Sequence, residues 1–133
     1  IARLSDIVSI HTPLTNETEN MIDNRFFNSV KPGMILINTA RGSIINISAL
    51  RIAMKEKIIN GAGLDVLPIE PSDDSQQLIV EWENNKEWLK GRLIITPHVA
   101  FYSPSALKEM RIKASHEAKR VLEGKSARNV VNS

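Results

Sequence analysis

Arg41, Glu70 and His98 are the side chains of this 133-residue chain whose types and settings suggest catalysis. Arg41 lies in an Asn-Thr-Ala-Arg-Gly run, Glu70 precedes a proline, and His98 follows a Thr-Pro pair. A guanidinium can hold a carboxylate through two parallel hydrogen bonds, and a histidine beside a glutamate can transfer a proton near neutral pH. We therefore predict a catalytic set for a substrate that carries a carboxylate next to a carbonyl or hydroxyl group.

The setting of these residues favours a functional role over a structural one. An isolated arginine after a strand is usually a surface ion-pair residue, an isolated histidine often packs or caps, and Glu70 could be loop surface. Each of the three, however, follows an apolar run that ends in small or turn-forming residues. Open α/β sheets place ligand-contacting groups at such strand ends. We expect Gly42 to permit a turn beside Arg41 that a larger residue would strain.

Four short apolar runs predict the strands that position these residues, at residues 6–11, 34–37, 61–66 and 93–95. The runs alternate with helical patterns, which predicts a parallel sheet with crossover helices. The run 34–37 is continuously apolar. We therefore expect this strand to be buried on both faces of the sheet.

Capping residues predict where the helices begin. Asp23 can cap a short helix that includes Val30, and either Asn46 or Ser48 can cap the next helix. A Ser-Pro start and apolar residues at helical spacing predict a long helix over residues 104–123.

Four runs in the same order, at residues 5–15, 32–42, 96–104 and 128–132, resemble the D-isomer-specific 2-hydroxyacid dehydrogenases, which depend on a nicotinamide cofactor. The resemblance covers nearly the whole chain. Residues 96–104 are most similar to the branch that includes the C-terminal-binding proteins, which are dehydrogenase-like corepressors. Phe101 stands where that branch carries tryptophan.

The resemblance implies an α/β fold, the C-terminal half of a Rossmann-type doubly wound parallel sheet in a two-domain protein. Residues 1–103 would form part of the dinucleotide-binding domain, and residues 104–133 a long helix and a tail that returns to the substrate domain. None of the six glycines forms the Gly-x-Gly-x-x-Gly run, so we expect this fingerprint upstream of Ile1. The isolated chain would then be inactive.

The implied activity is hydride transfer between NAD, with NADP not excluded, and C2 of a small D-2-hydroxy or 2-oxo acid. Arg41 would bind the carboxylate, and His98, hydrogen-bonded to Glu70, would donate a proton. Formate dehydrogenases resemble this plan but carry Gln at the acidic position. Residues implied to line the cofactor site are Thr12, Pro13, Thr18, Thr39, Ala40, Arg41, Asp65, His98 and Ala100.

Two of the cofactor assignments carry further expectations. Asp65 resembles the residue that receives the nicotinamide carboxamide, and we expect it to make no core contact. His11 ends a strand, where it could contact the cofactor or pack.

Composition is typical of one compact core, with 42% hydrophobic residues. The net charge of +2 is spread along the chain, so nucleic acid is not implied, and no stretch is long enough to span a bilayer. Cysteine is absent, which excludes disulfides and thiolate metal sites. We expect no metal ion, a cytoplasmic location and, for the full-length protein, a homodimer.

Alternatives remain at two points. The protein could be an NAD-regulated, corepressor-like binding protein or an inactive truncated remnant. The segment between Glu70 and His98 contains Trp82 and Trp88, which we expect to pack, although a subunit contact or a cover over the cofactor site is the alternative.

Overall fold

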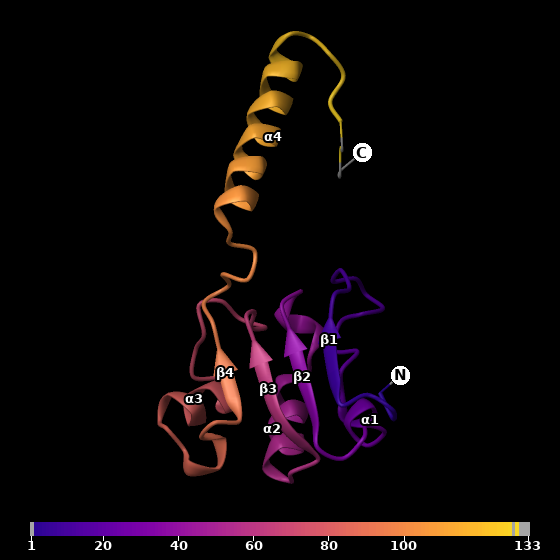
Figure 1. The fold of residues 1–133 in the computed structure, drawn as a ribbon, viewed down its shortest axis with the longest axis vertical. Coiled ribbons are helices and arrows are strands. Elements are labelled where there is room, and N and C mark those ends of the chain that lie inside the picture. Colours follow the sequence, from indigo (N-terminus) through magenta and orange to yellow (C-terminus); the bar gives the residue numbers. More distant parts are fainter. Residues whose placement is uncertain (1, 129, 131–133) are drawn as a thin grey trace. The chain divides into compact units, whose positions relative to one another are not determined.

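Four parallel strands form the sheet in this computed structural model, which describes residues 2–128 and 130. The strands are β1 (Ile7–Ile10), β2 (Met34–Asn38), β3 (Ile59–Leu64) and β4 (Leu93–Ile95), and they lie in that order with every neighbouring pair parallel (Figure 1). The predicted parallel sheet is confirmed. The carboxyl ends of all four strands therefore lie at one edge.

Helices connect the strands, and capping hydrogen bonds set where two of them begin. The helices of this part are α1 (Asn24–Phe27), α2 (Ile47–Lys55) and α3 (Gln77–Glu83), with short 3-10 turns η1 (Gly42–Ile44) and η2 (Glu87–Leu89). Asp23 accepts a hydrogen bond from the N–H of Phe26, as predicted, although α1 ends before Val30. Asn46, rather than Ser48, caps α2 by accepting from the N–H of Ala49.

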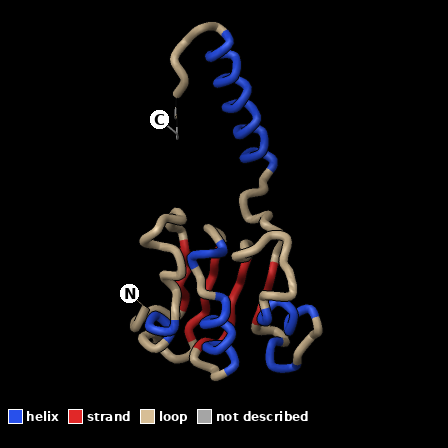
Figure 2. Tube along the Cα trace, turned by 180° about the vertical axis from the view of Figure 1, so that it is seen from behind, coloured by secondary structure: helices blue, strands red, loops and turns tan. Residues whose placement is uncertain are grey.

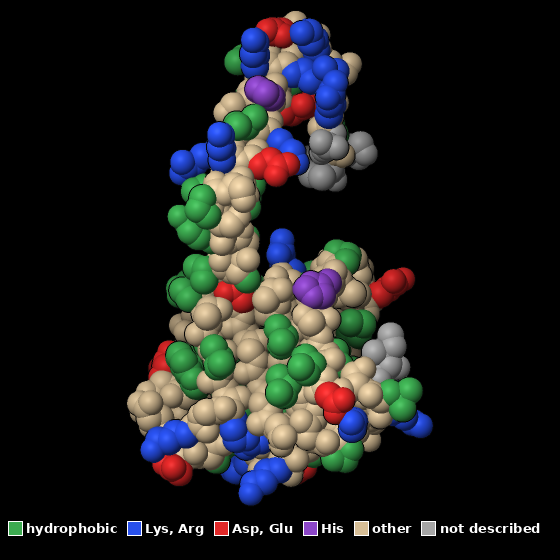
Figure 3. Space-filling model, viewed as in Figure 1, with side chains coloured by type: hydrophobic (Ala, Val, Ile, Leu, Met, Phe, Trp, Pro, Cys, Tyr) green, Lys and Arg blue, Asp and Glu red, His purple; other side chains and the backbone are tan. Residues whose placement is uncertain are grey.

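The expectation that residues 34–37 are buried on both faces is wrong. Met34 and Leu36 are fully buried, whereas Ile35 between them is 40% exposed. Successive side chains of a strand point to opposite faces, and α2 covers the face that carries Met34 and Leu36 (Figure 2). Ile7, paired with Ile35, and Ile94 are also exposed, and hydrophobic side chains lie open across the sheet in Figure 3.

The segment between β3 and β4 packs through its tryptophans. Trp82 and Trp88 lie against the hydrophobic core, and Leu78 and Leu89 of the same segment are buried in it. The indole N–H of Trp82 also donates to the carbonyl of Leu93 at 3.2 Å. These contacts support the packing interpretation of the segment.

Arg92 connects several elements through its guanidinium group. It donates to four carbonyl oxygens, those of Met54 and Ile59 at 2.8 Å, Asn60 at 2.9 Å and Trp88 at 3.1 Å. These carbonyls belong to α2, to β3 and to η2. One guanidinium group therefore donates hydrogen bonds to backbone carbonyls at the point where three elements meet.

Residues 101–133 form a second compact unit, separate from residues 1–100. The sequence predicts this boundary after residue 103, and the assignment of the two parts to two domains stays a prediction. The second unit contains α4 (Pro104–Leu122), and Ser103 caps it by accepting from the N–H of Ala106. The predicted long helix is confirmed, although none of its residues is buried. The motif at residues 128–132 lies partly outside the described residues.

None of the helices in the described part of the chain is both long and apolar enough to cross a membrane.

We expect Arg92→Ala to lower the free energy of unfolding by about 2 kcal/mol, because the backbone carbonyls around it lose the hydrogen bonds from its guanidinium. Urea unfolding followed by tryptophan fluorescence measures the change. Lys90→Ala is the control, because Lys90 makes an exposed ion pair with Glu87 and should change stability by less than about 0.5 kcal/mol. Equal effects of the two substitutions would contradict the assigned role of Arg92.

Candidate active site

Arg41, Glu70 and His98 line one cavity of about 210 Å³, although they are far apart in sequence. Arg41 follows β2, Glu70 follows β3 and His98 follows β4. Parallel strands bring their carboxyl ends to one edge of the sheet, so the three loops converge there (Figure 1). The structure thus brings together the three residues predicted to be catalytic.

Glu70 and His98 form a direct hydrogen-bonded pair, with 2.8 Å between Glu70 Oε2 and His98 Nδ1. The other carboxylate oxygen, Oε1, accepts from the N–H of Leu67 at 2.7 Å. Burial acts to raise the pKa of Glu70, but the hydrogen bonds from His98 and Leu67 outweigh burial, so the pKa is lowered. A charged carboxylate can only accept, so Nδ1 carries the shared proton and Nε2 is left for a ligand.

The backbone of His98 is held in an unusual conformation. Its φ is +53°, in the left-handed region that residues other than glycine seldom adopt. The N–H of His98 is shared between the carbonyls of Asp65 and Thr96, at 2.9 Å each. Such conformations persist where the surrounding structure imposes them, and here they turn the imidazole toward Glu70.

Asp65 supplies much of that constraint. Its side chain is buried, and it accepts from the hydroxyl of Thr96 at 2.5 Å and from the N–H groups of Val99 at 2.9 Å and Ala100 at 2.8 Å. Burial acts to raise the pKa of Asp65, but these hydrogen bonds outweigh it and the pKa is lowered. The expectation that Asp65 makes no core contact is therefore wrong. Its contact with a carboxamide stays a prediction.

Gly42 allows two of the catalytic loops to touch. A Cβ atom at this position would lie 1.9 Å from the carbonyl carbon of Leu67 and 2.4 Å from the nitrogen of Pro68. Gly42 begins the 3-10 turn η1, and a larger residue would be strained there as expected, but its φ is not in the left-handed region. Glycine is needed because the loop that carries Arg41 presses against the loop that carries Glu70.

Asn38 is a buried residue of the site that sequence reasoning did not single out. Its side chain bonds to the backbone of the loop that carries Arg41, accepting from the N–H of Ala40 at 3.0 Å and donating to the carbonyl of Arg41 at 2.9 Å. The sequence offers one signal, because an amide ends an otherwise apolar strand. That signal does not reveal which groups the amide bonds.

A second cavity, of about 610 Å³, lies at the carboxyl ends of β1 and β2. It is lined by Thr12, Pro13, Thr39, Ala40 and Arg41, all predicted cofactor-lining residues, together with His11 and Leu14. Small and polar side chains leave room for a flat ring and offer hydrogen bonds to it. This lining fits the nicotinamide end of a dinucleotide.

Three predicted or considered cofactor residues have other partners in the structure. Thr18 does not line this cavity, and its hydroxyl instead braces the preceding turn by donating to the carbonyl of Pro13 at 2.7 Å. The ring of His11 hydrogen-bonds the hydroxyl of Ser9 at 2.8 Å. Ala100 donates its N–H to Asp65, so its backbone helps to hold the loop that carries His98.

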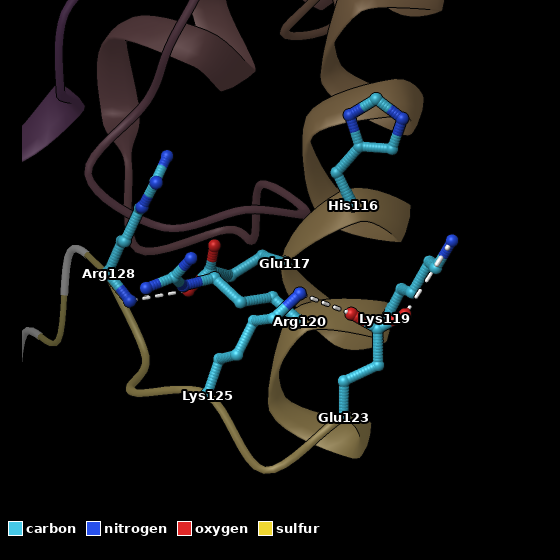
Figure 4. Close-up of a pocket in the computed structure, with 7 residues that line it drawn as sticks. All are labelled: His116, Glu117, Lys119, Arg120, Glu123, Lys125 and Arg128. Atoms are coloured by element: carbon cyan, nitrogen blue, oxygen red, sulfur yellow. Dashed lines mark hydrogen bonds and ion pairs between the residues drawn. The ribbon is translucent and has the colours of Figure 1, made fainter.

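Another cavity, of about 230 Å³, lies in the C-terminal unit and contains none of the predicted site residues (Figure 4). Its cations and carboxylates bond to one another, since Glu123 pairs with Lys119 and Lys125, and Glu117 accepts from the N–H of Arg128. In the part of the chain that the structure describes, no three His, Asp or Glu side chains are grouped as metal ligands.

Comparison with known proteins places this geometry in a family. Residues 1–100 match the model for D-isomer specific 2-hydroxyacid dehydrogenase, NAD binding domain. A glycerate dehydrogenase of Methylorubrum extorquens is 41% identical over 104 residues, which are 78% of this chain and 31% of that protein. A D-lactate dehydrogenase of Treponema pallidum is 32% identical over 124 residues, which are 90% of this chain and 38% of that protein.

A solved structure shows the same likeness in three dimensions. D-lactate dehydrogenase with NAD+ from Lactobacillus jensenii superposes with a TM-score of 0.80 and 32% identity, covering 99% of this chain and 41% of that one. The chain thus spans less than half the length of these relatives. None of the three is a C-terminal-binding protein, so the resemblance to that branch stays a prediction.

We expect Gly42→Ala to lower the free energy of unfolding by about 3 kcal/mol, because the new methyl group overlaps the backbone of Leu67. Gly63→Ala is the matched control, since a Cβ there meets no atom within 4 Å. That control should change stability by less than about 0.5 kcal/mol in urea unfolding. Similar losses for both glycines would show that close approach is not the reason for Gly42.

We expect Asp65→Asn to cost about 2 kcal/mol at pH 7, because an amide cannot accept all the hydrogen bonds that the carboxylate accepts. The folded-state pKa of Asp65 lies below its ordinary value of 3.8. The stability difference between the wild type and Asp65→Asn is therefore complete above that pH, and it is lost as the pH falls through the lowered pKa.

Urea midpoints between pH 7 and pH 3 measure this dependence. Asp74→Asn is the control, because Asp74 is exposed, and it should change stability by less than about 0.5 kcal/mol at every pH. A cost of Asp65→Asn that stayed constant down to pH 3 would rule out the charge as its cause.

Proposed function

This chain belongs to the D-isomer specific 2-hydroxyacid dehydrogenase family, and we propose that the protein containing it is an NAD-dependent oxidoreductase. Its substrates are a small D-2-hydroxy acid and the corresponding 2-oxo acid. The observation that carries the proposal is the single cavity lined by Arg41, Glu70 and His98. The relatives named above are dehydrogenases of glycerate and D-lactate, both 2-hydroxy acids.

Arg41 binds the substrate carboxylate. Its side chain is exposed at the cavity, where its planar fork can hold two carboxylate oxygens at once. Leu14, Leu67 and Pro68 give the same cavity an apolar wall. The carbonyl next to a bound carboxylate then lies within the cavity that His98 also lines.

His98 transfers the proton, and Glu70 orients it. Nδ1 donates to Glu70, so Nε2 faces the substrate oxygen and in the protonated ring can donate to it as negative charge develops during reduction. The carboxylate of Glu70 remains charged at neutral pH because its pKa is lowered, and it stabilises the positive ring. In the oxidative direction, the neutral ring accepts the hydroxyl proton through the same nitrogen.

NAD supplies the hydride chemistry when bound. Thr12, Pro13, Thr39 and Ala40 line the cavity that fits its nicotinamide end, and Arg41 lines both this cavity and the one assigned to substrate. Asp65, Ala100 and Thr18 act on the cofactor site chiefly by holding loops in place. A homodimer and a cytoplasmic location remain predictions of the sequence.

Substitution of the three residues should separate their roles when the protein reduces small 2-oxo acids with NADH. We expect Arg41→Ala to raise KM and lower kcat, so that kcat/KM falls by about 1000-fold. The reason is that the Arg41 guanidinium binds the carboxylate both in the bound substrate and in the transition state. His98→Ala should lower kcat by about 100-fold or more with a smaller effect on KM. Absorbance of NADH measures both constants.

Glu70→Gln should lower kcat of reduction by about 10-fold or more, because a neutral amide beside Nδ1 cannot stabilise charge on the His98 ring as the carboxylate does. Glu83→Gln, the same change at an exposed position, is the control and should leave kcat unchanged. An unchanged kcat in Glu70→Gln would mean that the Glu70–His98 pair does not act in proton transfer. Absence of any 2-oxo acid reduction by the wild type would overturn the proposed function itself.

A further inference from the structure

We propose that Asn38 is a positioning residue for Arg41, an inference that rests on the proposed function. Asn38 is the last residue of β2 and is fully buried. Met34 and Leu36 share its face of the strand and pack into the hydrophobic core. A buried amide among apolar side chains costs free energy unless its polar groups are hydrogen-bonded. The groups that Asn38 bonds therefore indicate what its side chain does.

Both polar groups of the Asn38 side chain bond to the backbone on either side of one peptide unit. Oδ1 accepts from the N–H of Ala40, and Nδ2 donates to the carbonyl of Arg41. The amide therefore brackets the peptide bond that joins Ala40 to Arg41. Both flanking peptide units are thereby held to one rigid side chain, which fixes where the Ala40–Arg41 segment begins and ends.

The bracketed peptide in turn aims the guanidinium. Arg41 Nη1 donates to the carbonyl of Ala40 at 2.7 Å, and this oxygen belongs to the bracketed bond. The side chain of Arg41 is exposed at the cavity, and packing alone does not hold its head. Ala40 therefore connects the buried amide to the guanidinium, because its N–H bonds to Asn38 and its carbonyl accepts from Arg41, the residue assigned to the substrate carboxylate.

The amide side chain of asparagine suits this task better than the side chains of leucine, aspartate or serine. Leucine has a similar size but would leave the Ala40 N–H and the Arg41 carbonyl without these partners. Aspartate keeps an acceptor for Ala40 but places a second oxygen against the Arg41 carbonyl. Serine can reach only one of the two groups at a time. Asparagine provides one donor and one acceptor in a fixed plane.

The test compares Asn38→Ala and Asn38→Ser with the wild type in the full protein, using NADH and the best small 2-oxo acid. Misplacement of a substrate-binding group by about 1 Å costs about 100-fold in rate. We expect kcat/KM to fall about 30- to 100-fold in Asn38→Ala, chiefly through KM for the acid, and less in Asn38→Ser. Affinity for NADH alone, measured by fluorescence titration, should change by less than about twofold.

Asn46→Ala is the matched control, because it also removes an asparagine side chain that accepts from a backbone N–H, that of Ala49, and Asn46 does not line the cavity that contains Arg41. It should lower the urea midpoint without raising KM. The decisive comparison repeats Asn38→Ala in a protein that also carries Arg41→Lys. The lysine ammonium is a flexible point charge, so its binding of a carboxylate does not depend on the orientation of a planar group. There Asn38→Ala should lower kcat/KM by less than about threefold.

Each other outcome contradicts the inference. Equal losses from Asn38→Ala in the wild-type and Arg41→Lys backgrounds would show that Asn38 does not act through the guanidinium. A loss of stability with unchanged KM, as in the control, would make Asn38 purely structural. A wild type that reduces no 2-oxo acid would refute the proposed function, whereas an active wild type with a normal KM in Asn38→Ala and Asn38→Ser would refute this inference alone.

Discussion

The buried carboxylate of Asp65 accepts hydrogen bonds from Thr96, Val99 and Ala100, and this cluster holds the turn on which His98 stands. Removing a carboxylate from water is costly, and the cost is offset here because both oxygens have donors in the fold. The same turn holds His98 at a φ of +53°, which the chain would not adopt without such support. The direction of the imidazole is therefore a consequence of a charge at the end of the neighbouring strand.

Two further contacts join the remaining loops to this cluster. The N–H of Asp65 donates to the carbonyl of Asn38, so the ends of β2 and β3 are linked beside the site. Gly42 then lets the loop after β2 rest against Leu67, whose N–H donates to Glu70. A shift of one loop would displace the others, because the loops contact one another through backbone atoms. Such contacts cannot relax by a change of side-chain rotamer.

Under the proposed function, this arrangement would place two ligands at the carboxyl ends of the strands. Arg41 lines the smaller cavity, proposed for the substrate, and also the larger cavity that fits the nicotinamide end of the cofactor. A carboxylate held by Arg41 would then lie between the cofactor and the pair formed by His98 and Glu70. Reduction needs a hydride donor for the carbonyl carbon and a proton donor for its oxygen, and this placement would bring both to one carbonyl group.

The sequence by itself determined the strands, the parallel sheet and the caps at Asp23 and Ser103, because periodicity and capping are local properties. It left the cap of α2 open between Asn46 and Ser48, which the structure decided. It also predicted Arg41, Glu70 and His98 as site residues, and the structure brings these three side chains to one cavity. Only the tertiary structure decided the roles of Asp65, Asn38 and Gly42. The partners of Asp65 lie about 30 residues later in the chain, and the atoms that exclude a side chain at Gly42 belong to another loop. The exposure of one face of β2 could likewise not be predicted from the sequence. An apolar run does not reveal which of its two faces is covered by a helix of the same chain.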